Sequence, residues 1–149
     1  MSQQQLQQLS QELQEIEEQI EALQTNVQAI QQEKTEVDEA IEALRSLETD
    51  STVQVPVGGG AYLRATIEDI DEVIVDLGAD YAAEFEEGDA VDVLENKKER
   101  LDDRIDEVNE DIAELETESS ELEQQAQQIQ QQAMQQQMQQ MGQGQGPDE

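Results

Sequence analysis

Residues 52–85 read TVQVPVGGGAYLRATIEDIDEVIVDLGADYAAEF, and this stretch decides the fold. It holds two apolar runs of β type, each followed by a Gly-containing turn and a second run that leads back. The predicted strand pairs are 52–57 with 62–67 around a turn at 58–60, and 73–77 with 81–85 around a turn at 78–80. Two β-hairpins are therefore predicted within residues 51–88.

Two long arms without helix breakers flank this centre. Every Gly and Pro lies between residues 56 and 88 or between residues 142 and 147. Apolar residues recur in both arms at alternating spacings of three and four, and 22 of the 25 positions in this seam are apolar, the exceptions being Lys34, Lys98 and Ser119. Such a repeat is typical of a coiled coil. We expect coiled-coil helices over 1–50 and 89–135, Asp89 as the N-cap of the second helix, and a disordered Gln- and Gly-rich tail over 136–149.

If the hairpins reverse the chain, the arms pair antiparallel, with opposed residue numbers that sum to about 137. The predicted fold is then α+β and mostly α, an antiparallel two-helix coiled coil joined by two central β-hairpins. The two seam lysines could fix this register, because Lys34 would face Asp102, Asp103 and Asp106, whereas Lys98 would face Glu36, Glu39 and Glu42. Alternatively, each lysine extends its ammonium group to solvent.

Composition excludes several classes of function. The chain has 38 acidic and 7 basic residues, a formal net charge of −31, and no Cys or His. Zinc–thiolate sites, cysteine nucleophiles and histidine acid–base chemistry are therefore excluded, and nucleic acid or an anionic membrane surface would be repelled. With no apolar stretch long enough to span a membrane and no signal-peptide pattern, we expect a cytoplasmic protein without enzymatic activity, cofactor or metal.

Two central features could suggest ligand sites, and a structural interpretation is favoured for each. Gly58-Gly59-Gly60 is not followed by Lys-Ser or Lys-Thr, so a hairpin turn is favoured over a phosphate-binding loop. The acidic connector at 68–72 lacks the ligand spacing and the Gly of an EF-hand, so a solvated acidic run is favoured over a calcium or magnesium site.

One end of the predicted coiled coil has no charged side chains. Residues 1–11 and 124–147 contain no charged side chain, and antiparallel pairing brings them to the same end, which we call the tip. Apolar side chains there could contact varied apolar segments of other proteins, methionine being especially adaptable. The candidate client-binding residues are Leu6, Leu9, Ile129, Met134, Met138 and Met141. The alternative is a frayed Gln-rich end without function.

The order helix, hairpin, hairpin, helix resembles the α-type subunit of prefoldin, a chaperone of archaea and eukaryotes. The central residues agree, with Val55-Pro56-Val57-Gly58 ahead of Tyr62 and VIVDLGA at 73–79. A single hairpin would resemble the β-type subunit instead. The resemblance covers residues 1–135, and the unusual acidity suggests a halophilic archaeal source.

The resemblance implies a hetero-hexamer of two α and four β prefoldin subunits, whose hairpins join into a β-barrel body. The tips of its coiled coils would hold non-native polypeptides without ATP and pass them to a group II chaperonin. Open strand edges on two small hairpins independently favour an obligate oligomer. The predicted assembly residues are Val53, Val55, Val57, Tyr62, Leu63, Ile67, Val73, Val75, Leu77, Tyr81 and Phe85.

Two other functions compete with the chaperone subunit. A structural coiled-coil scaffold or spacer, dimerised through its hairpins, would need only the length of the arms. A nucleotide-exchange cochaperone also joins long helices to β structure, but it would need a larger β domain than the residues 51–88 provide.

Overall fold

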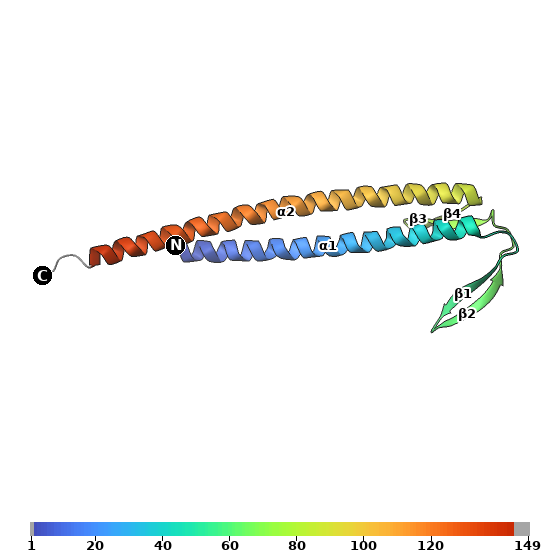
Figure 1. Ribbon diagram of the computed structural model, residues 1–149, viewed down its shortest axis with the longest axis horizontal. Helices are drawn as coiled ribbons and strands as arrows, with labels where there is room; N and C mark the ends of the chain where they lie inside the picture. Colours follow the sequence, from blue (N-terminus) through green and yellow to red (C-terminus); the bar gives the residue numbers. More distant parts are fainter. Residues whose placement is uncertain (1, 145–149) are drawn as a thin grey trace. The chain divides into compact units, whose positions relative to one another are not determined.

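The computed structural model describes residues 2–144 and contains two long helices and four strands (Figure 1). The element order is α1 (Ser2–Ser46), β1 (Thr52–Gly58), β2 (Ala61–Thr66), β3 (Val73–Gly78), β4 (Tyr81–Phe85) and α2 (Glu87–Gly144). The two helices pack antiparallel, with the two hairpins between them in sequence. The predicted fold class is therefore confirmed.

The chain divides into two units, to which both helices contribute. The terminal unit contains the described parts of residues 1–28 and 106–149, and the hairpin unit contains residues 29–105. In the terminal unit the buried side chains are Ile16, Val108 and Ile112. All three belong to the predicted seam, so this unit is held by a single apolar stripe between two helices.

The helices of the hairpin unit are packed along the same seam. Its buried seam residues are Ile30, Val37, Ile41, Val91, Leu94 and Leu101. Ala90, in the first turns of α2, has no exposed surface and is also part of this core. The heptad pattern thus identified the buried positions, because only the side chains at these spacings point toward the partner helix.

Strands β1 and β2 form an antiparallel hairpin in which Val53 opposes Ala65 and Val55 opposes Leu63. Gly59 and Gly60 connect them with φ angles of 59° and 79°, a left-handed conformation that suits a two-residue hairpin turn. The predicted turn is therefore present but shorter than 58–60, because Gly58 belongs to β1 and pairs with Ala61. Ile67 lies just beyond β2, and its N–H donates to the Ser51 carbonyl at 2.9 Å.

Strands β3 and β4 form a separate antiparallel hairpin, with Val73 opposite Phe85 and Val75 opposite Ala83. The Val75 side chain is 6% exposed. Val73 and Val75 line a pocket together with Ala40, Ala43, Leu44 and Leu94 from the two helices. One face of this hairpin therefore packs on the chain's own coiled coil, which the sequence did not predict.

Helix α2 starts earlier than predicted. The Ala90 N–H donates to the Glu86 carbonyl at 2.8 Å, which makes Glu86 the residue that precedes the first turn. Asp89 therefore lies inside the first turn, and its prediction as the N-cap is wrong. The carboxylate of Asp71, in the connector between the hairpins, accepts a hydrogen bond from the Glu87 N–H at 3.3 Å. A side chain distant in sequence thus satisfies a free N–H at this helix end.

Helix α2 also ends later than predicted, at Gly144. Residues 136–144, predicted as part of a disordered tail, are helical, and up to Met141 this stretch contains only Gln and Met, which are good helix formers. The rest of that predicted tail, 145–149, lies outside the described residues. In the part of the chain that the structure describes, neither long helix has the length of apolar sequence needed to cross a membrane.

Candidate functional site

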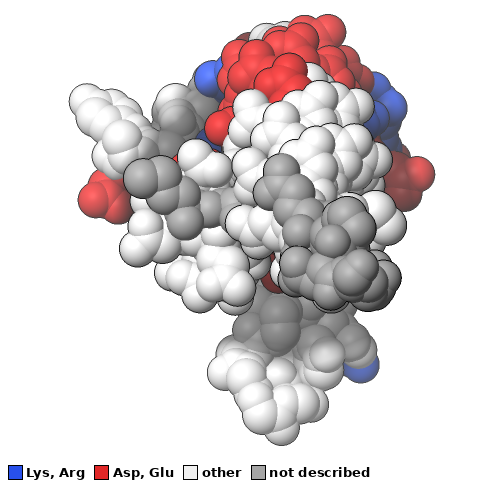
Figure 2. All heavy atoms as spheres, turned by 90° about the vertical axis from the view of Figure 1, so that its left-hand side faces the viewer, with Lys and Arg blue, Asp and Glu red and all other residues white. Residues whose placement is uncertain are grey.

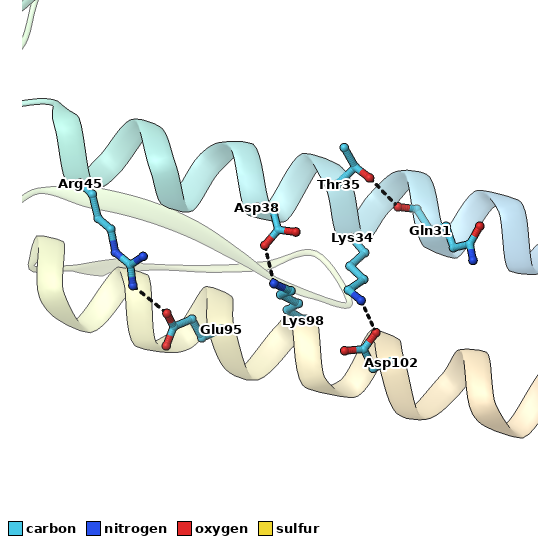
Figure 3. A network of polar contacts seen from close by, with 8 residues as sticks. All are labelled: Gln31, Lys34, Thr35, Asp38, Arg45, Glu95, Lys98 and Asp102. Atoms are coloured by element: carbon cyan, nitrogen blue, oxygen red, sulfur yellow. Dashed lines mark hydrogen bonds and ion pairs between the residues drawn. The ribbon is translucent and has the colours of Figure 1, made fainter.

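Four ion pairs join the two helices in the hairpin unit, three of them drawn in Figure 3. Lys34 Nζ lies 2.6 Å from an oxygen of Asp102, one of its three predicted partners. Arg45 lies 2.8 Å from Glu95, whereas Lys97 is at a looser 3.8 Å from Glu33. The numbers of the Lys34–Asp102 pair sum to 136, close to the expected value, so the antiparallel register of this unit is confirmed.

Lys98 reaches a carboxylate that the sequence did not single out. Its Nζ lies 2.7 Å from Asp38, and none of the predicted Glu36, Glu39 and Glu42 has a carboxylate oxygen within 4.0 Å of it, although Glu39 and Glu42 line the same pocket as Lys98. The residue numbers of Lys98 and Asp38 sum to 136, as do those of Lys34 and Asp102. The hydrogen bond that the Lys98 ammonium donates to the Asp38 carboxylate is the main cause that raises the pKa of Lys98 above its ordinary value of 10.5. Nearby Asp102 and Glu95 raise it further, while partial burial opposes the shift.

The terminal unit contains the predicted tip. The described parts of residues 1–28 and 106–149 belong to one unit, so the described parts of the two charge-free stretches lie in the same part of the molecule. Figure 2 shows the molecule from the left-hand side of Figure 1, and the described surface nearest the viewer there is largely uncharged. The charge pattern of the sequence is thus preserved as a neutral end on an acidic coiled coil.

The six candidate residues fall into two groups. Leu6, Leu9 and Ile129 are half-buried, as expected of side chains near the seam. The three methionines are exposed, at 64% for Met134, 72% for Met138 and 73% for Met141. They follow each other at spacings of four and three, so they share one face of α2. This face is rotated from the seam by one position, which leaves it open to solvent beside the coiled coil.

Helix α2 extends beyond the start of α1. The described part of α1 begins at Ser2, and the register of the ion pairs would place residue 2 opposite about residue 134. Figure 1 shows α2 continuing past the N-terminal end of α1. Met138 and Met141 therefore lie on a part of α2 that has no described residue of α1 opposite it.

The hairpin unit carries a second exposed apolar surface. Seven large apolar side chains on its strands are between 42% and 74% exposed: Val55, Val57, Tyr62, Leu63, Ile74, Leu77 and Tyr81. Six of these seven are predicted assembly residues, and only Ile74 was not predicted. Of the other predicted residues, Val53, Ile67, Val73 and Phe85 are half-buried and Val75 is buried.

The arrangement of the acidic side chains decides whether they could hold a metal ion. Among residues 2–144 no group of three or more acidic side chains is arranged to hold a metal ion. In the acidic connector, Asp69 accepts a hydrogen bond from the Asp71 N–H at 3.0 Å, while Asp71 binds the start of α2. These carboxylates thus shape the connector itself.

Comparison with known proteins agrees with these features. Residues 16–132 match the family model of the prefoldin subunit. The prefoldin subunit alpha of Halorubrum lacusprofundi is 60% identical over 105 residues, which cover 70% of this chain and 69% of that protein. The prefoldin subunit alpha of Haloquadratum walsbyi is 58% identical over 100 residues, which cover 67% of this chain and 65% of that protein.

A relative of known structure has the same fold. A chain in the cryo-electron microscopy structure of filamentous PFD from Methanocaldococcus jannaschii superposes with a TM-score of 0.67 at 26% sequence identity, covering 76% of this chain and 96% of that chain. The family model spans most of the chain, and two similar relatives are alpha subunits of halophilic archaea. The chain therefore belongs to the prefoldin family, a family of chaperones that are not enzymes, and it is an alpha-type subunit.

Proposed function

We propose that this chain is a holdase subunit that binds non-native polypeptides at its tip without ATP. The observation that supports this most is the row of exposed methionines on the charge-free end of α2. A client segment that covers Met134, Met138 and Met141 would bury apolar surface without removing any charge from water, and removal of a charge is the costly step in burial. Leu6, Leu9 and Ile129 would border this surface.

The glutamines of the tip support the same role. Gln side chains keep this end hydrated when no client is bound, yet they carry no charge that an incoming apolar segment would have to desolvate. The acidic side chains begin only at Glu12 on α1 and end at Glu123 on α2 before the charge-free stretch. Methionine, with its flexible thioether, adapts to clients of different shape.

The experiment uses light scattering of chemically denatured citrate synthase diluted into about 2 M KCl without ATP, a salt strength at which screening is nearly complete. Intact chain, assembled with its β-type partner, should suppress aggregation. Replacing Met134, Met138 and Met141 together by Gln should weaken suppression, because it removes apolar surface while helix propensity is kept. Replacing the same three by Leu is the matched control and should retain suppression.

The two variants separate the competing functions. Equal suppression by the Gln variant and the intact chain would place client binding away from the methionines. Absence of suppression by the intact complex would favour the structural scaffold, which needs only the length of the helices. Loss of activity in the Leu variant would contradict apolar contact as the basis of binding.

We further propose that the exposed strand residues join this chain to β-type subunits, in a complex of two α and four β chains. Seven exposed apolar side chains and the open edges of two-stranded sheets support this, because both are unfavourable in water and both would be covered by neighbouring strands. Sedimentation of the mixed subunits would test it: Tyr62→Ser with Leu63→Ser should reduce the hexamer, and the exposed helix substitution Gln130→Ser should not.

Delivery of clients to a group II chaperonin and a cytoplasmic location belong to the same proposal. The supporting argument is membership of the prefoldin family. A captured client should refold when a group II chaperonin and ATP are added, and it should stay bound when the chaperonin is added without ATP.

A further inference from the structure

The basic residues of this acidic chain are confined to one part of it. All seven Lys and Arg residues lie between residues 34 and 104, inside the hairpin unit. Four of them, Lys34, Arg45, Lys97 and Lys98, are joined to carboxylates of the opposite helix. These four are accounted for by the packing of the coiled coil itself.

Arg100 and Arg104 are not used in this way. Within the described part of the chain neither guanidinium has a carboxylate oxygen within 4.0 Å, and both side chains are exposed. They lie four residues apart on α2, so two like charges share one face of the helix, an arrangement that is unfavourable unless something neutralises it. Lys97, three residues before Arg100, extends this face.

The three cations border a cavity of about 360 Å³. The opposite wall is the end of the second hairpin, with Asp76, Leu77 and Gly78, and the remaining lining includes Glu33 and Leu101. Two of the carboxylates are already engaged, since Asp76 accepts a hydrogen bond from the Gly78 N–H at 3.0 Å and Glu33 lies 3.8 Å from Lys97. The cavity thus has net positive lining in a chain of net charge −31.

Leu77 links this cavity to the assembly surface. It lines the cavity and is also one of the exposed apolar residues at the end of the hairpin, where its neighbour Gly78 pairs with Tyr81. A neighbouring subunit that covers Leu77 must therefore also lie against the cavity. The charges that complement its lining are carboxylates.

We propose that Arg100 and Arg104, with Lys97, form a docking surface for a carboxylate-bearing segment of the β-type subunit that joins the second hairpin. This inference rests on the proposed assembly with β-type subunits. Ion pairs of this kind select the partner and its orientation more than they add affinity, which suits a complex in which α and β subunits must be distinguished.

The test is the dissociation constant between this chain and the β-type subunit of the same organism, measured by fluorescence anisotropy in about 1 M and about 3 M KCl. Arg100→Gln with Arg104→Gln should weaken binding about tenfold in the lower salt and less in the higher salt, because screening reduces the lost attraction. Arg100→Lys with Arg104→Lys keeps the charges and should stay within about threefold of the intact chain.

A matched control changes the net charge of the chain by the same amount as the Arg→Gln variant, but away from the proposed docking surface. Asn109→Asp with Ser120→Asp adds two negative charges at exposed positions of α2 outside the hairpin unit, and it should leave the dissociation constant unchanged. Equal binding by the Gln variant and the intact chain would overturn the docking surface, as would equal weakening by the control. Failure of the intact chain to bind the β-type subunit would instead overturn the proposed assembly. An effect of the Gln variant on self-association alone would overturn the choice of partner.

Discussion

Lys34 occupies a seam position that an apolar residue would fill in a regular coiled coil. Its ammonium group remains partly exposed and reaches Asp102 at 2.6 Å, so the lysine is tolerated because one register supplies a carboxylate at that point. The pair thus contributes to alignment of the helices more than to their stability, as is usual for exposed ion pairs.

A double-mutant cycle on this pair tests its contribution. Lys34→Met, Asp102→Asn and the double variant should give a coupling of about 0.5 kcal/mol in urea unfolding at low salt, falling as KCl is added. The cycle of Lys97→Met with Glu33→Gln, whose atoms are 3.8 Å apart, is the control and should show a smaller coupling. Equal coupling in the two cycles would mean that the close contact of Lys34 has no special role.

Lys98 should make the stability of the folded chain depend on pH, and the direction of this dependence follows from its pKa. Its pKa is raised above 10.5 in the folded chain, chiefly by the hydrogen bond with Asp38. A raised folded pKa stabilises the fold at pH values below the unfolded pKa, and this contribution is lost as the pH rises through the folded value. The melting temperature of Lys98→Gln should therefore lie below that of the intact chain at neutral pH, and the two should converge at the alkaline end of a titration past 10.5.

Arg45→Gln provides the control for this titration. This substitution leaves the Lys98–Asp38 pair in place, so the difference between Arg45→Gln and the intact chain should stay constant as the pH rises past 10.5. A constant difference for Lys98→Gln as well would show that titration of Lys98 does not affect stability.

At the scale of elements, the second hairpin has a turn that its sequence suits poorly. Ala79 and Asp80 both adopt positive φ, 52° and 62°, a conformation that is strained for alanine. In a two-residue turn of this kind Asn is preferred at the first position. Ala79→Asn should therefore stabilise β3 and β4 by about 0.5–1 kcal/mol, measured as slower hydrogen exchange of their amides.

The control is Ala82→Asn, on β4, where the backbone does not adopt positive φ. This substitution should leave exchange unchanged or make it faster, since Asn is a weak strand former. Slower exchange in both variants would mean that the turn conformation is not the cause.

Periodicity and breakers predicted these elements well, because both report local constraints on the backbone. The strand pairs followed from apolar runs separated by glycines, and the buried seam residues followed from their spacing. The position of Val75 did not, since alternation in a strand shows two faces but not which one a helix covers. The cap supplied by Asp71 was also hidden, because it depends on a contact between residues 71 and 87 that only the folded connector creates.

The features of the candidate site were also predicted only in part from the sequence. Absence of charge at 1–11 and 124–147 identified the tip, and the offset of the methionines from the seam explained their exposure. The helical state of 136–144 was missed because composition rich in Gln suggested disorder, whereas an existing helix can continue through good helix formers at little cost. Asp38 was missed as the partner of Lys98 because several carboxylates lie within a turn of each other, and register alone does not choose among them.

At the scale of the whole molecule, charge is the dominant property. The terminal unit has five acidic residues in 2–28, nine in 106–144 and no basic residue in either stretch, whereas every Lys and Arg belongs to the hairpin unit. Repulsion between the helices should thus be strongest in the terminal unit. In molar salt the Debye length is about 3 Å and this repulsion is screened.

We predict that lowering KCl from molar strength to about 50 mM, where screening extends beyond about 10 Å, reduces helix content and that the terminal unit loses it first. Circular dichroism measures the total loss, and hydrogen exchange assigns it to residues. The control is sucrose added in place of KCl. Because sucrose is uncharged and does not screen charges, it should not restore the helix content that is lost at low salt. Unchanged circular dichroism at low salt, or exchange that rises first in the hairpin unit, would contradict the prediction.

The pairing of the first residues of α1 with α2 residues more than about a hundred positions later in the chain has a consequence for folding. During synthesis, the apolar seam of α1 emerges long before its partner, and the contacts of the tip join residues more than about a hundred positions apart, which makes direct closure slow. Once the hairpins reverse the chain, each new turn of α2 meets the matching turn of α1 at small additional entropy cost. The coiled coil should therefore close progressively from the hairpins, and the tip should be the last part of the molecule to form.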